Sequence, residues 1–142
     1  MELDKNGIAL GDTSEDRKAR KKFIKEFYKV WGTLNPTKQI FNKSLNEYVS
    51  VKHISVEETS GQASIKYKST LAILFLSEIW ENSNRKGVPR NADPEKNNQK
   101  RFEKIIIMEY IKSEFGKVKL TVGVKRGTKE KVQYCITAIE ND

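Results

Sequence analysis

The chain has 142 residues and a formal net charge of +8, from 27 Lys and Arg against 19 Asp and Glu. This length predicts one domain, and an aromatic content of 9% supports a packed core and argues against a fully disordered chain. The single cysteine, Cys135, excludes an internal disulfide, and together with the single histidine, His53, it leaves no set of ligands for a structural zinc.

Apolar runs are too short for a membrane span, since the longest covers only 71–76. The first residues include an acid and a glycine, where a signal peptide would have basic and then apolar residues. We therefore expect a cytoplasmic protein with no membrane partner. The excess of basic residues favours an anionic partner, of which nucleic acid is the commonest.

The first strong element is a basic amphipathic helix, predicted over 14–31. Residues 1–12 before it are expected to form a flexible lead or a short edge element. Thr13 or Ser14 offers an N-cap, and Gly32 predicts the C-terminal end. Apolar residues recur at helical spacing on one face. The other face carries Arg17, Lys18, Arg20, Lys21, Lys22, Lys25, Glu26 and Lys29.

The middle of the chain is predicted to hold a strand and two helices. Weak alternation of apolar and polar residues predicts the strand over 45–54. Ser55 and Glu58 have capping-box spacing, so a short helix is expected to begin at Ser55 and to stop by Gly61. A broad apolar stripe predicts a mostly buried helix over 68–83.

The last part of the chain begins with a polar segment, 82–100, which is predicted to be a long, mobile loop. Three strands of an antiparallel meander are predicted after it, over 101–114, 117–125 and 131–139. The predicted fold class is therefore α+β, with N-terminal helices packed on a C-terminal antiparallel β-sheet. Residues 13–142 are expected to form this single domain.

Two features of the sequence could carry catalysis. Histidine titrates near neutral pH, and His53 lies where a strand is predicted to meet a helix, so it is either an acid–base catalyst or an ordinary histidine. The strand 117–125 should project several cations from one face, because side chains repeat every two residues. These cations could stabilise a phosphate, or they could form only a solvated sheet face. They are Lys117, Lys119 and Lys125, beside Thr121.

The last strand alternates as well. This pattern places Gln133, Cys135 and Thr137 on one face and Tyr134, Ile136 and Ala138 on the other. Thr137 could then share the cationic face, Tyr134 would pack or lie at its edge, and Cys135 would be a small buried hydrophobe. Because the sequence has no metal-binding acid cluster and no nucleotide-binding glycine motif, any hydrolysis is expected to need neither metal nor cofactor.

The order SVKHISVEETSGQASIKYKSTLAILFLSEIWENS, which begins at Ser50, resembles the middle of small phage and mobile-element domains grouped as barnase/EndoU/colicin/RelE-like (BECR-fold) nucleases. Those domains run from a strand through a short helix start to a helix ending in Leu-x-Glu-Ile-x-x-Asn. They close with strands rich in valines and cations, as in GKVKLTVGVKRGTKEKVQYCITAIE. The resemblance covers roughly residues 45–140. The residues of this chain that match the pattern at the end of that helix are Leu76, Glu78, Ile79 and Asn82.

This resemblance implies a toxin-like, metal-independent RNase, acting on RNA such as tRNA by attack of a 2′-hydroxyl on the adjacent phosphate. It also implies a cognate inhibitor or immunity protein as a partner. The residues proposed for catalysis are His53, Lys119, Thr121, Tyr134 and Thr137. The residues proposed to bind nucleic acid are Arg17, Lys21, Lys25, Arg90, Lys125 and Arg126.

The alternative hypothesis is a non-catalytic binding module for nucleic acid, a nucleotide-like ligand or an acidic protein, for example a phage counter-defence protein. Seven basic residues and one acid give 17–31 a charge of +6, and six basic residues and two acids give 85–101 a charge of +4. These two segments are expected to capture the anion. A pocket that holds His53 together with the cations of the last strands would favour the RNase hypothesis. A position of His53 away from those cations would favour the binding module.

Overall fold

The protein is built on one six-stranded sheet whose main core lies between the sheet and the helices. The computed structural model describes residues 1–138. In this part of the chain the helices are α1 (Ser14–Leu34), α2 (His53–Ala63), α3 (Tyr67–Ile73) and α4 (Leu76–Asn82), with a 3-10 turn at Asn97–Gln99. The strands are β1 (Gln39–Asn42), β2 (Glu47–Ser50), β3 (Asn84–Asn91), β4 (Phe102–Lys112), β5 (Gly116–Lys125) and β6 (Lys131–Ala138).

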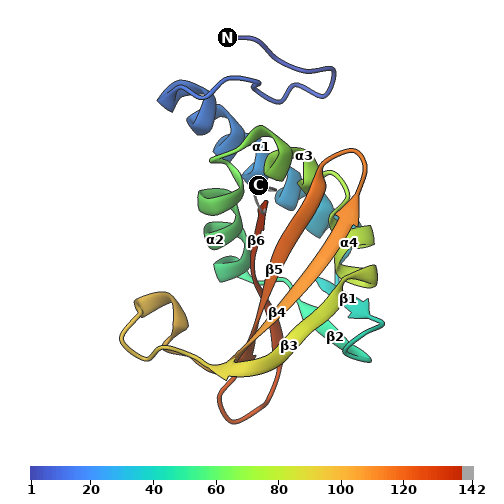
Figure 1. Ribbon diagram of the computed structural model, residues 1–142, viewed down its shortest axis with the longest axis vertical. Helices are drawn as coiled ribbons and strands as arrows, with labels where there is room; N and C mark the ends of the chain where they lie inside the picture. The colour runs from blue at the N-terminus through green and yellow to red at the C-terminus, as the bar shows by residue number, and fades with distance from the viewer. Residues whose placement is uncertain (139–142) are drawn as a thin grey trace.

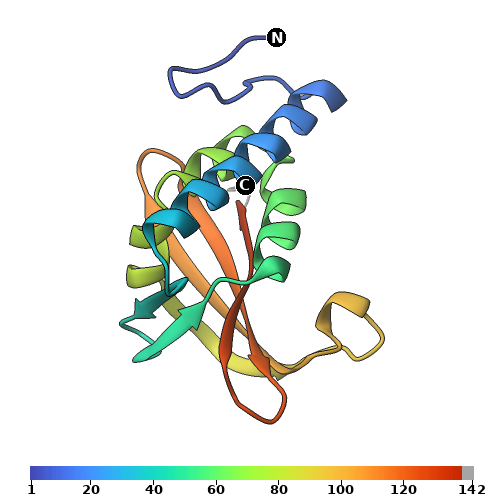
Figure 2. The ribbon, with the colours of Figure 1, turned by 180° about the vertical axis from the view of Figure 1, so that it is seen from behind.

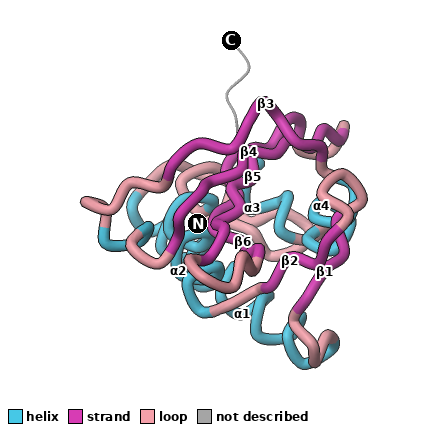
Figure 3. The backbone as a smooth tube through the Cα atoms, turned by 90° about the horizontal axis from the view of Figure 1, so that it is seen from below, coloured by secondary structure: helices cyan, strands magenta, loops and turns pink. Residues whose placement is uncertain are grey.

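The strand order is β1-β2-β6-β5-β4-β3, so the predicted meander β4–β5–β6 forms the middle of the sheet. The α+β fold class is confirmed, but the sheet is mixed, because β2 runs parallel to the start of β6. From behind, α1 crosses one face of the sheet, whereas the face of β3, β4 and β5 turned to the viewer in Figure 1 carries no helix (Figures 1 and 2). Seen from below, the strands form one curved layer with β3 at its edge (Figure 3).

The loop predicted over 82–100 is wrong for Asn84–Asn91, which form the edge strand β3. No side chain of β3 is fully buried, so the strand is held mainly by its backbone pairing with β4, and apolar patterning could not reveal it. The pairing shifts register between Lys86 and Arg90, where Gly87 has a φ of 66° and Pro89 lacks an N–H group.

The single helix predicted over 68–83 is also wrong, since α3 and α4 are separated at Leu74 and Phe75. The buried residues Ala72, Leu76 and Ile79 keep helical spacing across this interruption, so the sequence period does not show it. The strand predicted over 45–54 is shorter in the structure and pairs with β1, which has no counterpart in the prediction.

The start of α1 follows the prediction, and its end does not. The Thr13 hydroxyl accepts a hydrogen bond from the N–H group of Asp16, and the Asp16 carboxylate accepts one from the Thr13 N–H group, which completes a capping box. Gly32 is not the C-cap, because the helix continues to Leu34 and is capped by Asn35. The basic helix is therefore longer than the predicted 14–31.

Arg20 does not belong to the solvated face of α1, where the sequence pattern places it. Its side chain is fully buried. The guanidinium donates hydrogen bonds to four backbone carbonyls, those of Ala9, Gly11, Ser64 and Ile65. It thereby connects α1 both to the N-terminal segment, in which Ala9 forms a bridge with Leu3, and to the junction between α2 and α3.

We expect the substitution Arg20→Leu to lower the free energy of unfolding by about 2–4 kcal/mol, because it leaves several buried carbonyls without a donor. Chemical denaturation measures this loss, and hydrogen exchange should show faster exchange of the Leu10 amide, which is bonded to the carbonyl of Glu2. Arg17→Leu, at an exposed position of the same helix, is the control and should change stability little. Equal stability of the two variants would contradict the role given to Arg20.

Candidate functional site

The exposed face of α1 presents a shallow groove lined by lysines. The opposite face of the helix is fixed in the core by Ile24, Tyr28 and Trp31, and the Trp31 indole N–H donates a 2.9 Å hydrogen bond to the Ser77 hydroxyl. The lysines therefore stand on a helix of fixed orientation. The groove is lined by Lys18, Lys21, Lys22, Lys25, Glu26 and Lys29.

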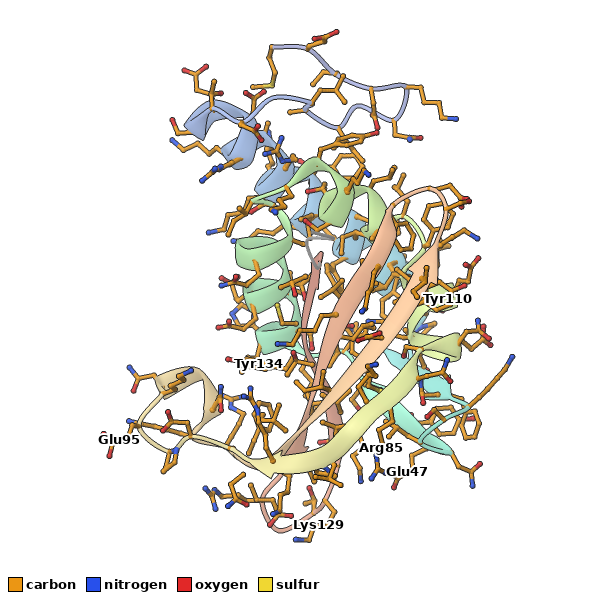
Figure 4. The ribbon with its side chains drawn as sticks, in the orientation of Figure 1. Glu47, Arg85, Glu95, Tyr110, Lys129 and Tyr134 are labelled. Carbon is orange, nitrogen blue, oxygen red and sulfur yellow. The ribbon has the colours of Figure 1, made fainter. Side chains whose placement is uncertain are left out.

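A second basic region lies where the loop before β4 meets the turn between β5 and β6. The Arg126 N–H group donates to the carbonyl of Arg101, and its side chain donates to the carbonyl of Lys100, so the loop and the turn are joined. Lys125 precedes this turn and is half-buried. Lys129, in the same turn, lies at the end of the molecule opposite the N-terminal segment (Figure 4).

His53 is the first residue of α2, and its side chain is 89% exposed. Its Nε2 atom lies 3.9 Å from a carboxylate oxygen of Glu57, which also contacts Lys25 of α1 at 3.4 Å. His53 borders a hollow of about 240 Å³ between α1 and α2. The other residues of this hollow are Tyr28, Trp31, Lys38, Val51, Lys52 and Val56. None of the β5 cations lines it.

The strand residues proposed for catalysis lie on the sheet face that points away from the main core. Val118 and Leu120 belong to that core, so Lys119 between them points to the other side. Lys119 is paired in register with Thr137, and Thr121 with Cys135. Lys119, Thr121 and Thr137 therefore share one face. Glu109 on β4 lies 3.5 Å from the Lys117 ammonium and 3.8 Å from that of Lys86, so part of the charge on this face is neutralised.

The alternation predicted for the last strand is wrong, because β6 contains a bulge. Val122 pairs with Gln133 and Thr121 pairs with Cys135, which leaves Tyr134 as an extra residue. The Gln133 amide consequently turns toward the helices. Tyr134 instead joins Cys135 in a second, smaller hydrophobic cluster on the other face of the sheet, where its ring packs 5.8 Å from that of Phe102.

Helix α2 covers the edge of β6 beyond the short pairing with β2. The Ser55 hydroxyl donates to the carbonyl of Gln133, and the Thr59 hydroxyl accepts from the N–H group of Ile136. These hydroxyls satisfy backbone groups that a neighbouring strand would otherwise bind. α2 begins two residues earlier than predicted, because Ser55 also accepts a hydrogen bond from the Lys52 N–H group and so acts as the third residue of the helix.

Burial keeps the possible nucleophiles and proton donors of this region neutral. It raises the pKa of Tyr134 and that of Cys135 to about 12, and the negative charge of Glu58 adds to both shifts. The pKa of Tyr28 is raised as well, because its hydroxyl is buried. At physiological pH, Tyr134 supplies no phenolate and Cys135 no thiolate.

Comparisons with protein-family models, with curated proteins and with solved structures found no match for this chain. The resemblance to BECR-fold nucleases and the RNase function therefore remain predictions. Among residues 1–138, no group of three or more His, Cys, Asp or Glu side chains could hold a metal ion. In the same part of the chain, no helix is long and apolar enough to cross a membrane.

The neutral state of Cys135 is testable by thiol labelling. Because the reactive thiolate fraction falls about tenfold for each unit by which the pKa rises, we expect labelling of the native protein with iodoacetamide at pH 8 to be at least about a hundredfold slower than labelling in denaturant. The native rate should rise with pH throughout the range from 7 to 10. Equal rates in the native and denatured protein would contradict this assignment.

A second test concerns the close packing on the face of β5 that points away from the main core. A Cβ atom at Gly123 would lie 2.6 Å from the Phe102 ring, so Gly123→Ala should lower the free energy of unfolding by about 1–3 kcal/mol. A Cβ atom at Gly61 in α2 would have no atom within 4 Å, so Gly61→Ala should raise the free energy of unfolding by about 0.5–1 kcal/mol. Denaturant titration of both variants checks the opposite signs, and a loss at both positions would refute the packing argument.

Proposed function

We propose that this chain is a non-catalytic module that binds nucleic acid through the lysine face of α1. The observation that carries the proposal is the regular spacing of these lysines on a helix whose other face is anchored in the core. Lys18, Lys22, Lys25 and Lys29 repeat at intervals of four, three and four residues, so they form one stripe about 16 Å long. In a duplex, a length of 16 Å along the axis carries about five phosphates of each strand.

The charges of this stripe are largely available to a ligand. Among residues 1–138, no carboxylate lies within 4.0 Å of the ammonium groups of Lys18, Lys22 or Lys29, and Lys25 alone in the stripe pairs with a carboxylate, that of Glu57. Lysine ammonium groups that neutralise phosphates release counterions from the nucleic acid, and this release drives binding without regard to sequence. The stripe is therefore suited to hold a phosphate backbone.

The positions of the predicted catalytic residues favour binding over cleavage. Metal-free cleavage of RNA requires an acid and a base within hydrogen-bond reach of the same phosphate. His53 borders the hollow between α1 and α2, whereas Lys119 and Thr137 lie together on the sheet face away from the main core. Tyr134 is only 7% exposed.

Replacing Lys18, Lys22 and Lys29 together by Gln should weaken binding of a fluorescein-labelled 20-nucleotide RNA at least about tenfold at 50 mM salt, because three phosphate contacts are lost. Fluorescence anisotropy over a range of salt concentrations measures this loss, and the slope of log K against log[salt] should fall by about two. The control removes the same charge from the sheet by replacing Lys104, Lys117 and Lys119, and it should change affinity by less than about threefold. Equal losses in both triple variants would contradict an interface on α1.

Cleavage is tested separately by incubating the protein with total tRNA in EDTA. We expect the tRNA to remain intact. Cleavage by the unaltered protein that disappears in the double variant His53→Ala, Lys119→Ala would overturn the non-catalytic proposal and support the RNase hypothesis instead. Cleavage that persists in the double variant would indicate a contaminating nuclease, and the tRNA result would then have to be repeated with protein free of it.

A further inference from the structure

The hollow between α1 and α2 combines an apolar wall with a basic mouth. Tyr28 and Trp31 of α1 and Val56 of α2 contribute to the wall, and Lys38, Lys52 and His53 bring the basic groups. The hollow adjoins the lysine stripe of α1, because Glu57 contacts both Lys25 of the stripe and His53 of the hollow. A strand held on α1 therefore passes close to it.

The backbone holds Lys38 in an unusual and well-defined conformation. Its φ is 51°, in the left-handed region that side chains other than glycine and asparagine seldom adopt. Hydrogen bonds fix it on both sides, from its N–H group to the Asn35 carbonyl and from the Val51 N–H group to its own carbonyl. These two bonds therefore fix the point from which the Lys38 side chain leaves the backbone.

The side chain of Lys38 is also guided toward the hollow. Its Cε atom would lie 3.3 Å from a Cβ atom at position 32, so its stem runs beside α1 where the helix has Gly32. Lys38 is one of the residues that line the hollow. The glycine that the sequence pattern assigns to the end of the helix instead leaves room for this lysine.

Lys38 is the basic group of the mouth that remains available to an anion. Lys52 lies 3.3 Å from a carboxylate oxygen of Glu130, and His53 lies 3.9 Å from one of Glu57. Among residues 1–138, no carboxylate lies within 4.0 Å of the Lys38 ammonium. A phosphate entering the hollow would therefore be bound first by Lys38.

The apolar part of the hollow suits a flat ring. Tyr28 and Trp31 are 4% and 6% exposed, so only a small part of each side chain reaches the hollow. The Trp31 indole is held by its hydrogen bond to Ser77, and the side chains of Val51 and Val56 extend the apolar surface. A ligand that joins a planar ring to an anionic group matches both parts of the hollow.

We infer that this hollow binds one nucleotide, with its phosphate at Lys38 and its ring against the wall formed by Tyr28, Trp31 and the two valines. The nucleotide is either an unpaired residue of the strand on α1, in which case the inference rests on the proposed function, or a free mononucleotide. Because a base in a duplex is not available to enter a hollow, the first source makes the protein prefer single strands.

The test removes the charge of Lys38 without disturbing its backbone. Asn tolerates the left-handed region, so the variant is Lys38→Asn. The matched control is Lys129→Asn, since Lys129 has a φ of 62° and faces Glu103 instead of the hollow. Anisotropy is measured with one labelled 12-nucleotide RNA, first single-stranded and then annealed to its complement, and AMP binding is measured by NMR titration.

We expect the unaltered protein to bind the single strand at least about tenfold more tightly than the duplex. Lys38→Asn should weaken single-strand binding about fivefold to tenfold and leave duplex binding within about twofold, whereas Lys129→Asn should change neither by more than about twofold. A second variant, Val56→Phe, reduces the space in the hollow and should give the same selective loss, with circular dichroism confirming that it is folded.

The outcomes separate the two proposals. If Lys38→Asn leaves both affinities unchanged while the α1 triple variant loses binding, the nucleotide site is wrong and the proposed function stands. If no RNA binds but AMP shifts the resonances of the hollow in the unaltered protein and not in Lys38→Asn, the site takes free nucleotides and the proposed function fails. Loss of single-strand and duplex binding to the same extent in Lys38→Asn would reduce Lys38 to a general phosphate contact and overturn the inference.

Discussion

The buried amide of Gln133 is the contact on which the arrangement of the helices depends. It donates to the hydroxyls of Tyr28 on α1 and Thr59 on α2, so one side chain of the last strand binds both helices at once. The amide reaches them because the bulge at Tyr134 turns Gln133 toward the main core. Buried polar groups are costly unless they are hydrogen-bonded, so the two bonds of the amide nitrogen make this contact specific as well as stabilising. The amide oxygen of Gln133 is buried and has no hydrogen-bond partner among the described residues. The two helices that it joins enclose the hollow, and α1 also carries the lysine stripe.

The two faces of α1 therefore have different roles, because one anchors the helix on the sheet and the other presents the lysines. Its apolar face and its tyrosine fix the helix on the sheet, and this fixed position orders the lysines on the opposite face. Arg20 belongs to the anchoring face in spite of its charge, because four backbone carbonyls surround its guanidinium. Basic residues of one helix are consequently divided between holding the fold together and facing solvent, and burial distinguishes the two groups.

Much of the architecture can be predicted from the sequence where side-chain patterns are strict. The alternating valines of β5 and the cap at Thr13 are local signals, and both lead to the observed elements. Features that depend on residues far away in the sequence cannot be predicted from these local patterns. β3 forms through backbone pairing with β4, the burial of Arg20 requires carbonyls about 45 residues away, and the bulge at Tyr134 depends on register with β5. The hollow at Lys38 has no sequence signal, since its lining comes from three separate segments.

The irregular edge strand β3 also affects how separate copies of this protein meet in solution. A regular edge with free N–H and C=O groups would act as a template on which another chain could add a strand. Here the register shift and Pro89 interrupt that template, and the cationic side chains of Arg85 and Arg90 repel a second basic molecule. This edge of the sheet is therefore poorly suited to accept a strand from another copy.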